Sequence, residues 1–485
     1  MTTEVNMKLI KKTVSVLALL FVVFAMTGCA QLLSKLAGKI EEETPEPEYP
    51  SVTTEDESSF IARYGQVYTI TVKGERSDNG ILTYQWYKGT TSSRDAAVAI
   101  DGAAAKLAAY IFTTPAAPAK DGEVSYYWCK VTNTNAATGK KAESWSDYFK
   151  VTVSNIERVH GYIEENTTWN PLYTYYVDSW LTVYKSLIIP AGTVVKLGKE
   201  GSINTTGEGT ITAIGTESLP ITFTSYLDHS VGITISEFAG SATKAAKGDW
   251  KGVEISGAQG STFTYANFRY STVYALGLFK KATVSSCTFT DNKSNDHSGA
   301  LTIGEAGNES IVSNNVFYNN DWPLTCPKNY TVDTSNIFHN PNDENIKNVY
   351  QAIILKDGSY IENAKTVKWN VTELPYYFVD DWFTVSDGTL IIGDATHDVI
   401  VKFTAGSSID TDEKGTLKLG ASSILTSWKD DAHGGDMEAN EQPVDPDWGD
   451  WEGISLYGSE KWGWDNAINK DTDRVLYNDK SKYQN

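Results

Sequence analysis

The sequence predicts an all-β protein, in which an antiparallel β-sandwich is followed by a right-handed parallel β-helix and by a second, partial copy of that β-helix. Three observations support this prediction. Short alternating strands with turn signals fill residues 51–155, a long segment returns after about 200 residues, and phenylalanines recur every 21 or 28 residues in the first copy. Alternation with period two is typical of half-buried strands, and a fixed longer period indicates stacked coils.

The first 29 residues have the layout of an export signal. Lysines precede an uncharged apolar run from Val14 to Phe24, which is short for a membrane-spanning helix. The Gly28-Cys29 junction that follows resembles the lipobox of bacterial lipoproteins, although Met26 stands where leucine is usual. The resemblance implies cleavage before Cys29 and a lipid on that cysteine. An ordinary cleaved signal, or an apolar helix that ends in a cysteine, is the alternative.

The segment 30–50 and the overall charge bear on location and partners. Residues 30–50 are acidic and interrupted by prolines, which is typical of a flexible tether.

The chain has a formal net charge of −20, so we expect no nucleic-acid partner, because nucleic acid requires a cationic surface. Solubility at a cell surface explains this charge, and affinity for cations or basic partners is the alternative. With its lipid at Cys29 in the membrane, the protein is expected in the bacterial cell envelope, at the outer membrane or cell surface.

Residues 51–155 are expected to form the sandwich, with strands separated by Asn-Gly and Asp-Gly turns. The order of their motifs resembles a bacterial immunoglobulin-like domain. Trp86 stands where such domains bury a tryptophan, and Tyr127 precedes Cys129 by two residues, as the tyrosine-corner residue does. The early strand offers no second cysteine, so Cys129 is expected to pack as a small hydrophobic residue. The resemblance implies a spacer or an adhesion module.

Residues 156–355 are predicted to form the first β-helix, because each coil would place a similar side chain above the last. The phenylalanines at intervals of 21, 28 and 21 residues (289 − 268, 317 − 289, 338 − 317) are Phe268, Phe289, Phe317 and Phe338. The asparagines that follow them, where an amide is able to bond the backbone at a corner, are Asn292, Asn320 and Asn340. Cys287 takes the place that Asn315 has in a later coil, so we expect an interior residue rather than a reactive thiol.

Residues 356–485 are predicted to form the partial second copy. Trp169 returns as Trp369 and Trp250 as Trp451, at offsets of 200 (369 − 169) and 201 (451 − 250). The repeated segments resemble those that open the β-helices of many bacterial surface proteins. Only a few dozen residues follow Trp451, against more than eighty after Trp250, so this copy is expected to be short or truncated.

An acidic loop in the second copy is the candidate metal site. Its carboxylates are grouped around glycines, and Ca²⁺ requires hard oxygen ligands delivered by tight turns. The candidate ligands are Asp430, Asp431, Asp436 and Glu438. Their spacing differs from that of a helix-loop-helix calcium motif, and a solvated acidic loop without an ion is the alternative.

Aromatic residues in polar segments are the candidate ligand-facing groups, because their rings are suited to stacking on sugars. The tryptophans among them are Trp428, Trp448, Trp462 and Trp464. The tyrosines considered with them are Tyr173, Tyr175, Tyr376 and Tyr377. The Asp-Trp pairs at 249–250 and 450–451 occur in both copies, which favours a structural role at a corner.

These features favour a non-catalytic structural, adhesive or binding role, with a polysaccharide or a surface protein as partner. The alternative is a polysaccharide lyase or glycoside hydrolase, because such enzymes use this fold. An enzyme would bring an acid and a base together on adjacent coils. Arg269 has no basic counterpart at its register, and Asp291 and Asp321 occupy unequal places after their phenylalanines. No nucleophile elbow, phosphate loop or zinc spacing is present in the sequence.

Overall fold

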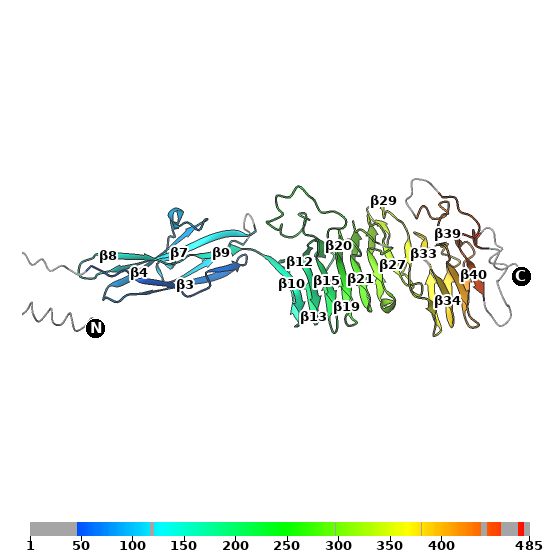
Figure 1. Ribbon diagram of the computed structural model, residues 1–485, viewed down its shortest axis with the longest axis horizontal. Helices are drawn as coiled ribbons and strands as arrows, with labels where there is room; N and C mark the ends of the chain where they lie inside the picture. Colours follow the sequence, from blue (N-terminus) through cyan, green and yellow to red (C-terminus); the bar gives the residue numbers. More distant parts are fainter. Residues whose placement is uncertain are drawn as a thin grey trace, which may run out of the picture. The chain divides into compact units, whose positions relative to one another are not determined.

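The structure, a computed structural model, describes residues 46–116, 121–295, 297–379, 381–437, 444–456 and 474–479 (Figure 1). The predicted export signal with Cys29, most of the tether, and the candidate residues Glu438, Trp462 and Trp464 lie outside these ranges. The chain forms two compact units, Met1–Thr114 with Val124–Thr152 and Pro115–Glu123 with Val153–Asn485. No helix among the described residues is long and apolar enough to cross a membrane.

The first unit contains two β-sheets. One has the strand order β1 (Ser51–Thr54), β3 (Val67–Glu75), β6 (Ala109–Thr113). The other has the order β2 (Ser59–Ala62), β9 (Phe149–Val153), β7 (Glu123–Thr134), β4 (Ile81–Gly89), β5 (Val98–Ala99), with β8 (Lys141–Trp145) beside β7. Two 3-10 turns, η1 (Arg94–Ala96) and η2 (Ala104–Lys106), lie between β4 and β6.

The core of the first unit is built around Trp86 of β4. Its ring is fully buried and lies 5.8 Å from that of Tyr110 on β6 in the other sheet, and 5.8 Å from that of Phe149. Its Nε1 hydrogen is donated to the carbonyl oxygen of Leu107 at 2.8 Å, so the polar atom of this large side chain is satisfied. Cys129 is a buried free thiol, as expected, and burial raises its pKa to about 12.

The second unit is a right-handed parallel β-solenoid of about 11 turns. Strands one turn apart pair in parallel on three faces. The first face contains the first half of β12 (Thr174–Val183), then β14 (Val194–Leu197), β17 (Ile221–Ser225), β20 (Ala266–Arg269), β23 (Thr288–Thr290) and β26 (Val316–Tyr318). The second face contains the second half of β12, then β15 (Ser202–Thr205), β18 (Gly252–Ile255), β21 (Leu276–Leu278), β24 (Leu301–Ile303), β27 (Leu324–Cys326) and β30 (Ile353–Leu355). The third face contains β11 (Thr167–Thr168), β13 (Ser186–Pro190), β16 (Thr210–Ile214), β19 (Ser261–Thr264), β22 (Ala282–Ser285) and β25 (Ile311–Ser313).

Four further elements complete the first copy. The strand β10 (Ile156–Ile163) pairs with both halves of β12. The 3-10 turn η3 (Glu305–Gly307) follows β24. After β26 the chain forms an antiparallel hairpin from β28 (His339–Asn340) and β29 (Asp343–Lys347).

The second copy continues the solenoid but is displaced by one face. By the sequence repeat, the strands that correspond to the first face are β33 (Tyr376–Phe378), β36 (Ile400–Phe403) and β39 (Ile424–Ser427). The first of them, β33, pairs with β30, and β36 and β39 follow in the same row, so these strands continue the second face. The remaining strands form two further sheets, β31 (Tyr360–Ile361), β34 (Trp382–Val385), β37 (Ser408–Thr411), β40 (Gly453–Leu456), and β32 (Lys365–Trp369), β35 (Gly388–Ile392), β38 (Thr416–Leu419).

The predicted phenylalanine stack is confirmed and is one ring longer. All its rings are fully buried on the first face, and Phe223 precedes Phe268 in the same row. Successive ring centroids, from Phe223 to Phe338, are 4.7, 5.0, 4.9 and 5.3 Å apart and nearly parallel. These spacings match the separation of neighbouring strands, so each coil buries a ring against its equivalents.

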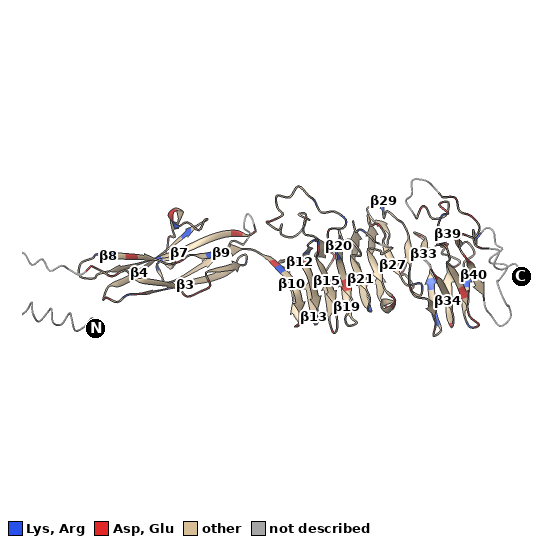
Figure 2. Ribbon diagram, in the orientation of Figure 1, with Lys and Arg blue, Asp and Glu red and all other residues tan. Residues whose placement is uncertain are grey.

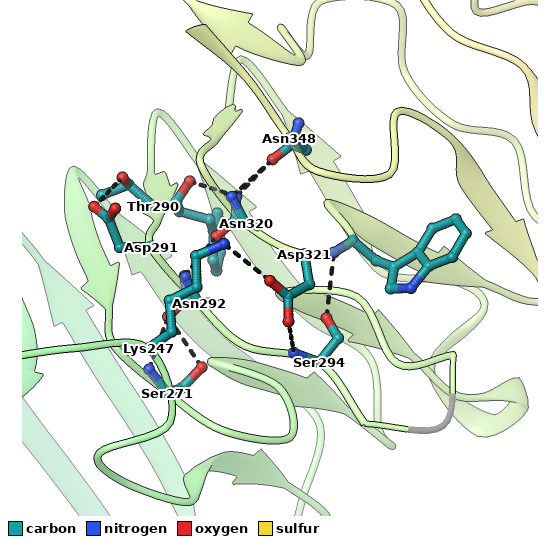
Figure 3. Close-up of polar contacts among 11 residues, drawn as sticks. Lys247, Ser271, Thr290, Asp291, Asn292, Ser294, Asn320, Asp321 and Asn348 are labelled. Carbon is teal, nitrogen blue, oxygen red and sulfur yellow. Dashed lines mark hydrogen bonds and ion pairs between the residues drawn. The ribbon is translucent and has the colours of Figure 1, made fainter. Parts of the chain in front are cut away.

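A ladder of buried polar side chains runs along the corner between the first and second faces (Figure 3). Asn292 donates its Nδ2 hydrogen to Oδ1 of Asn320 at 2.9 Å, and Asn320 donates to Asn348 in the same way. Each amide also donates to a phenylalanine carbonyl oxygen of the preceding coil. Ser271 begins the ladder by donating to Asn292 at 3.0 Å. The ladder therefore satisfies backbone groups that the turn removes from the strand pairing.

The prediction of Asn340 at this corner was wrong, because Asn340 lies in the β28–β29 hairpin that leaves the coil after Phe338. Asn348 is the residue that returns to the corner, and its Nδ2 donates to the carbonyl oxygen of Phe338 at 3.1 Å. At the corner before the first face, Cys287 is buried and its main-chain N–H donates to Oδ1 of Asn315, so its predicted interior position is confirmed.

Residues 474–479 pair with part of the edge of the second copy. The N–H of Leu425 on β39 donates to the carbonyl oxygen of Arg474 at 2.7 Å, and the N–H of Leu476 donates to that of Leu425 at 2.8 Å. Asp479 donates in the same way to Trp451. Residues 474–479 thereby occupy backbone groups of the terminal coil that an uncovered edge would leave free.

We predict that Asn320→Ala lowers the free energy of unfolding by about 3 kcal/mol, because it leaves the amide of Asn292 and the carbonyl oxygen of Phe289 buried without this partner. Urea and thermal unfolding measure the change. Asn342→Ala, at an exposed asparagine of the hairpin, is the matched control. Equal losses in the two variants would contradict a structural role for the ladder.

Candidate functional site

A buried polar cluster lies on the outer side of the first face. Lys196 is fully buried and its Nζ donates to the main-chain oxygen of Asp228 at 2.8 Å. Asp228 accepts from Thr224 at 2.6 Å and pairs with Arg269 at 2.5 Å. Burial acts to raise the pKa of Asp228, but hydrogen bonds from Ser230 and Thr224 and the charge of Arg269 outweigh it and lower that pKa. The cluster thus places one carboxylate beside two basic side chains inside packed protein.

The second copy repeats this arrangement. Lys402 is fully buried and donates to the main-chain oxygen of Gly435, and Thr426 donates to Asp430 at 2.6 Å. His433 takes the place of arginine as the partner of the carboxylate, with its Nδ1 2.7 Å from Asp430. In the first copy these contacts attach the loop after β17 to the outer side of the face, and in the second copy they attach the loop after β39. The repetition of the cluster indicates that it anchors these loops.

The candidate calcium ligands lie in different environments, because only Asp430 belongs to this buried cluster. Asp430 is buried and bonded within the protein, whereas Asp431 and Asp436 are exposed, and Glu438 lies outside the described residues. Within the described ranges, no group of three or more His, Cys, Asp or Glu side chains is placed to hold a metal ion. Calcium binding by this loop stays a prediction.

The repeated Asp-Trp pairs have the structural role that their repetition favours. Trp250 and Trp451 are buried, and each donates its Nε1 hydrogen to a main-chain carbonyl oxygen at 2.8 Å. Asp249 and Asp450 accept hydrogen bonds from serine hydroxyls at 2.6 and 2.7 Å. The pairs therefore close the turns before β18 and β40.

The predicted ligand-facing aromatics are only partly exposed. Trp448 is 45% exposed, and Trp428 is half-buried against an apolar cluster. Tyr175, Tyr376 and Tyr377 are buried, which corrects the expectation that they lie on polar loops. They belong to strands, and the hydroxyls of Tyr175 and Tyr376 accept main-chain hydrogen bonds inside the coil. Such bonds allow a tyrosine to be buried without an unsatisfied polar group.

Exposed aromatics instead lie on the outer side of the second face at the start of the solenoid. Tyr162 of β10 and Trp180 of β12 are 59% and 45% exposed, with ring centroids 4.9 Å apart. The ring centroid of Tyr184 lies 5.7 Å from that of Tyr162. Leu181 and Val183 alternate with Trp180 and point into the core, so the pleat of the strand directs this tryptophan outward.

The second copy has the same exposed pair. Tyr360 and Trp382 are 44% and 40% exposed, with centroids 5.2 Å apart. The register is also the same, since Tyr162 pairs with Thr182 and Tyr360 with Thr384. The exposed Tyr–Trp contact is thus a repeated feature of the surface.

A hollow of about 420 Å³ lies beside the first pair. Ser202 and Asn204 of β15, which line it, are the neighbours of Trp180 and Thr182 in the next coil. Glu254 of β18 follows, and accepts a hydrogen bond from the hydroxyl of Tyr274 at 2.7 Å. We call this surface the first strip, which consists of Tyr162, Trp180, Ser202, Asn204 and Glu254.

The corresponding residues of the second copy form the second strip, which consists of Tyr360, Trp382, Ser408, Asp410 and Ser455. Few strand residues of the solenoid are charged (Figure 2), yet each strip has one carboxylate, on Glu254 and on Asp410. Burial raises the pKa of Asp410, against a hydrogen bond from Ser408 and together with the charges of Glu452 and Asp412. Each strip therefore combines apolar rings with hydrogen-bonding groups.

The acids and the base considered for an enzyme make separate contacts. Arg269 pairs with buried Asp228, and Asp291 accepts a hydrogen bond from Thr290 at 2.7 Å. Asp321 pairs with Lys247 at 2.9 Å and accepts from the N–H of Ser294 (Figure 3). These contacts do not join the three groups into one acid–base set.

No protein-family model matches the chain, and no curated protein matches it in sequence. Among solved structures, the pectate lyase PelI from Erwinia chrysanthemi in complex with tetragalacturonic acid is similar with a TM-score of 0.15 and 8% identity, over 86% of this chain and 92% of that one. The pectate lyase Pel3 from Pectobacterium carotovorum gives a TM-score of 0.13 and 7% identity, over 86% and 94%. These scores support no argument about activity or ligand.

The sequence contains a signal for the strips that a search for aromatics on polar segments misses. Trp180 and Trp382 occupy the same place in the repeat, and each precedes an alternating pair of residues that are buried in the core. Strand alternation then places both tryptophans outside. Their contact with Tyr162 and Tyr360 depends on the pairing of coils, which no local pattern gives.

We predict that replacing Lys196 by Met changes how stability depends on pH. Burial lowers the pKa of Lys196 to about 8, so the folded protein releases this proton at a lower pH than the unfolded chain does. Wild type should therefore gain stability relative to Lys196→Met as pH rises from about 8 toward the ordinary lysine pKa, by up to about 3 kcal/mol. Urea unfolding of both proteins across this range measures the gain.

Lys199→Met, at an exposed lysine nearby, is the control for the substitution itself. A difference between wild type and Lys196→Met that stays constant with pH would contradict a charge buried at this position.

Proposed function

We propose that this chain is a non-catalytic, glycan-binding protein of the bacterial cell envelope, exported and retained by a lipid on Cys29. The exposed Tyr–Trp pair that occurs in both copies carries the proposal. Exposed apolar rings gathered in one place are typical of binding surfaces. The C–H face of a sugar ring stacks on such rings, while its hydroxyl groups need the hydrogen-bonding side chains that each strip places beside them.

The neighbours of the two pairs differ, which supports a role for the rings themselves. Asn204 stands in the first strip where Asp410 stands in the second, and Glu254 where Ser455 stands. The aromatic residues remain at these positions although both are exposed to water and contribute little to the core. A structural role would favour buried rings, as at Trp250 and Trp451.

The first unit would serve as a spacer. We propose that it is immunoglobulin-like, on the basis of the buried Trp86 between its two sheets and of Tyr127 two residues before Cys129. With the acidic tether, such a unit would separate the solenoid from the membrane that holds the lipid. This arrangement suits a protein that binds polymers at the cell surface.

A polysaccharide lyase or hydrolase is the alternative function. It would require an acid and a base that face one open cleft. In the hollow of the first strip, Tyr274 donates to Glu254, and burial together with this carboxylate raises the pKa of the tyrosine. The phenol therefore keeps its proton and is unsuited to act as a base. This geometry favours binding over catalysis.

The test uses the chain from Gln31 onward, which keeps every residue that the structure describes, and columns of plant, bacterial and host polysaccharides. We expect wild type to be retained, with the chain length of the polysaccharide unchanged. Replacing Tyr162, Trp180, Tyr360 and Trp382 together by Ala should weaken retention by about tenfold or more, because the stacking surface is lost.

Tyr49→Ala and Tyr148→Ala, at exposed tyrosines outside the solenoid, are the matched controls. Equal retention of wild type and the fourfold variant would refute the strips as the site. Shortened polysaccharide chains would establish the enzyme instead.

A further inference from the structure

We infer that the two strips bind two separate chains of a neutral polysaccharide, so that one protein molecule bridges them. This inference rests on the proposed function, since it assigns a geometry and a ligand class to the same surfaces. It depends on three observations, which are the displacement of the second copy, the distance between the strips and the charge beside each aromatic pair.

The displacement places the strips on different faces. The first strip lies on β10, β12, β15 and β18, and its row of strands continues through β30 into β33, β36 and β39. The second strip lies on β31, β34, β37 and β40, which form another sheet. A polymer that follows the first strip along the solenoid would therefore reach the outer side of β33 and not the Tyr360–Trp382 pair.

An apolar cluster covers the continued face at the junction between the copies. Tyr377 of β33 and Ile354 of β30 are on the outer side of the continued face, and both are buried. The ring of Trp322 is stacked on Tyr377 at 5.7 Å, and Met437 packs on the same group from the loop of the second copy. Because these residues cover the continued face, a polymer has no open path along it between the two strips.

The strips are also far apart along the solenoid. Seven strand spacings separate β12 from β33, in the order β12-β15-β18-β21-β24-β27-β30-β33, and β34 follows β33 in the same turn. With a spacing of ~4.8 Å between neighbouring strands, β12, which holds Trp180, lies ~34 Å from β33, which precedes the strand of Trp382. Each strip itself spans only three such spacings, or ~14 Å. The two aromatic pairs therefore act as separate sites.

The charges beside the pairs favour a neutral polymer. Glu254 lies in the first strip, and Asp410 with Glu452 beside it lies in the second. Lys251, the cationic residue that lines the first hollow, is paired with Glu200 at 2.5 Å. A uronic acid polymer would bring carboxylates against carboxylates, which is unfavourable. The hydroxyl groups of a neutral sugar instead donate hydrogen bonds to them.

The experiment tests bridging directly, with the chain from Gln31 onward. Beads with a covalently attached polysaccharide are loaded with protein, washed and exposed to the same polysaccharide in soluble, fluorescent form. The polymers are a β-glucan, an α-glucan, a mannan, an arabinoxylan and polygalacturonate. The variants are Tyr162→Ala with Trp180→Ala, Tyr360→Ala with Trp382→Ala, and all four substitutions together.

We expect wild type on at least one neutral polymer to capture the soluble chains, and no capture with polygalacturonate. Each two-residue variant should still bind the beads but lose capture by about tenfold or more, because only one site remains. The fourfold variant should bind neither the beads nor the soluble chains. Melting temperatures equal to that of wild type show that the variants are folded, which is expected because all four side chains are exposed.

The outcomes separate the inference from the proposed function. If the fourfold variant binds beads as wild type does, or if no polymer is bound, the proposed function itself fails. If one two-residue variant loses all binding, or if either variant still captures soluble chains, the strips bind glycan but do not bridge as two independent sites. Preference for polygalacturonate would overturn the neutral ligand.

Discussion

The hydrogen-bonded corner amides are the interaction on which the coils from Ser271 to Asn348 depend. Between the first and second faces the backbone turns through left-handed residues, with φ of 56° at both Asp291 and Asn319. Such a turn removes main-chain groups from the strand pairing, and the amides of Asn292, Asn320 and Asn348 bond to those groups inside the protein. Only with the corner closed do the three faces enclose a common core. In β12, which spans the first two faces as one strand, the pleat alone buries Leu181 and exposes Trp180.

The sequence predicts features that repeat in register and misses those that depend on the path between repeats. Phe268, Phe289 and Phe317 are predictable because equal positions in successive coils hold equal side chains. Asn348 could not be predicted, since the hairpin after Phe338 delays the return of the chain to the corner. The displacement of the second copy by one face has no local signal either, because periodicity gives the order of coils and not the face on which a new copy begins.

The candidate site shows the same limit. Polar segments around Tyr175 and Tyr376 indicate exposure, yet main-chain donors inside the coil satisfy their hydroxyls and allow burial. Trp180 and Trp382 are instead exposed although they are large and apolar, because strand alternation directs them outward. The hollow next to Trp180 requires three coils to be in register, so it emerges only from the folded chain. Composition therefore indicates which residue types are present, whereas pairing decides which ones meet.

The segment that pairs with the edge of β39 has a consequence for self-assembly. Residues 474–479 lie along β39 and Trp451, where a further turn of the solenoid would otherwise add. A parallel edge without this segment would accept a strand from another molecule in a head-to-tail contact, and such a contact leaves a new edge for the next molecule. Growth would then proceed without closure, as in a filament. At β39, the short stretch around Val475 occupies the backbone groups that an incoming strand would need, and so opposes growth through this strand.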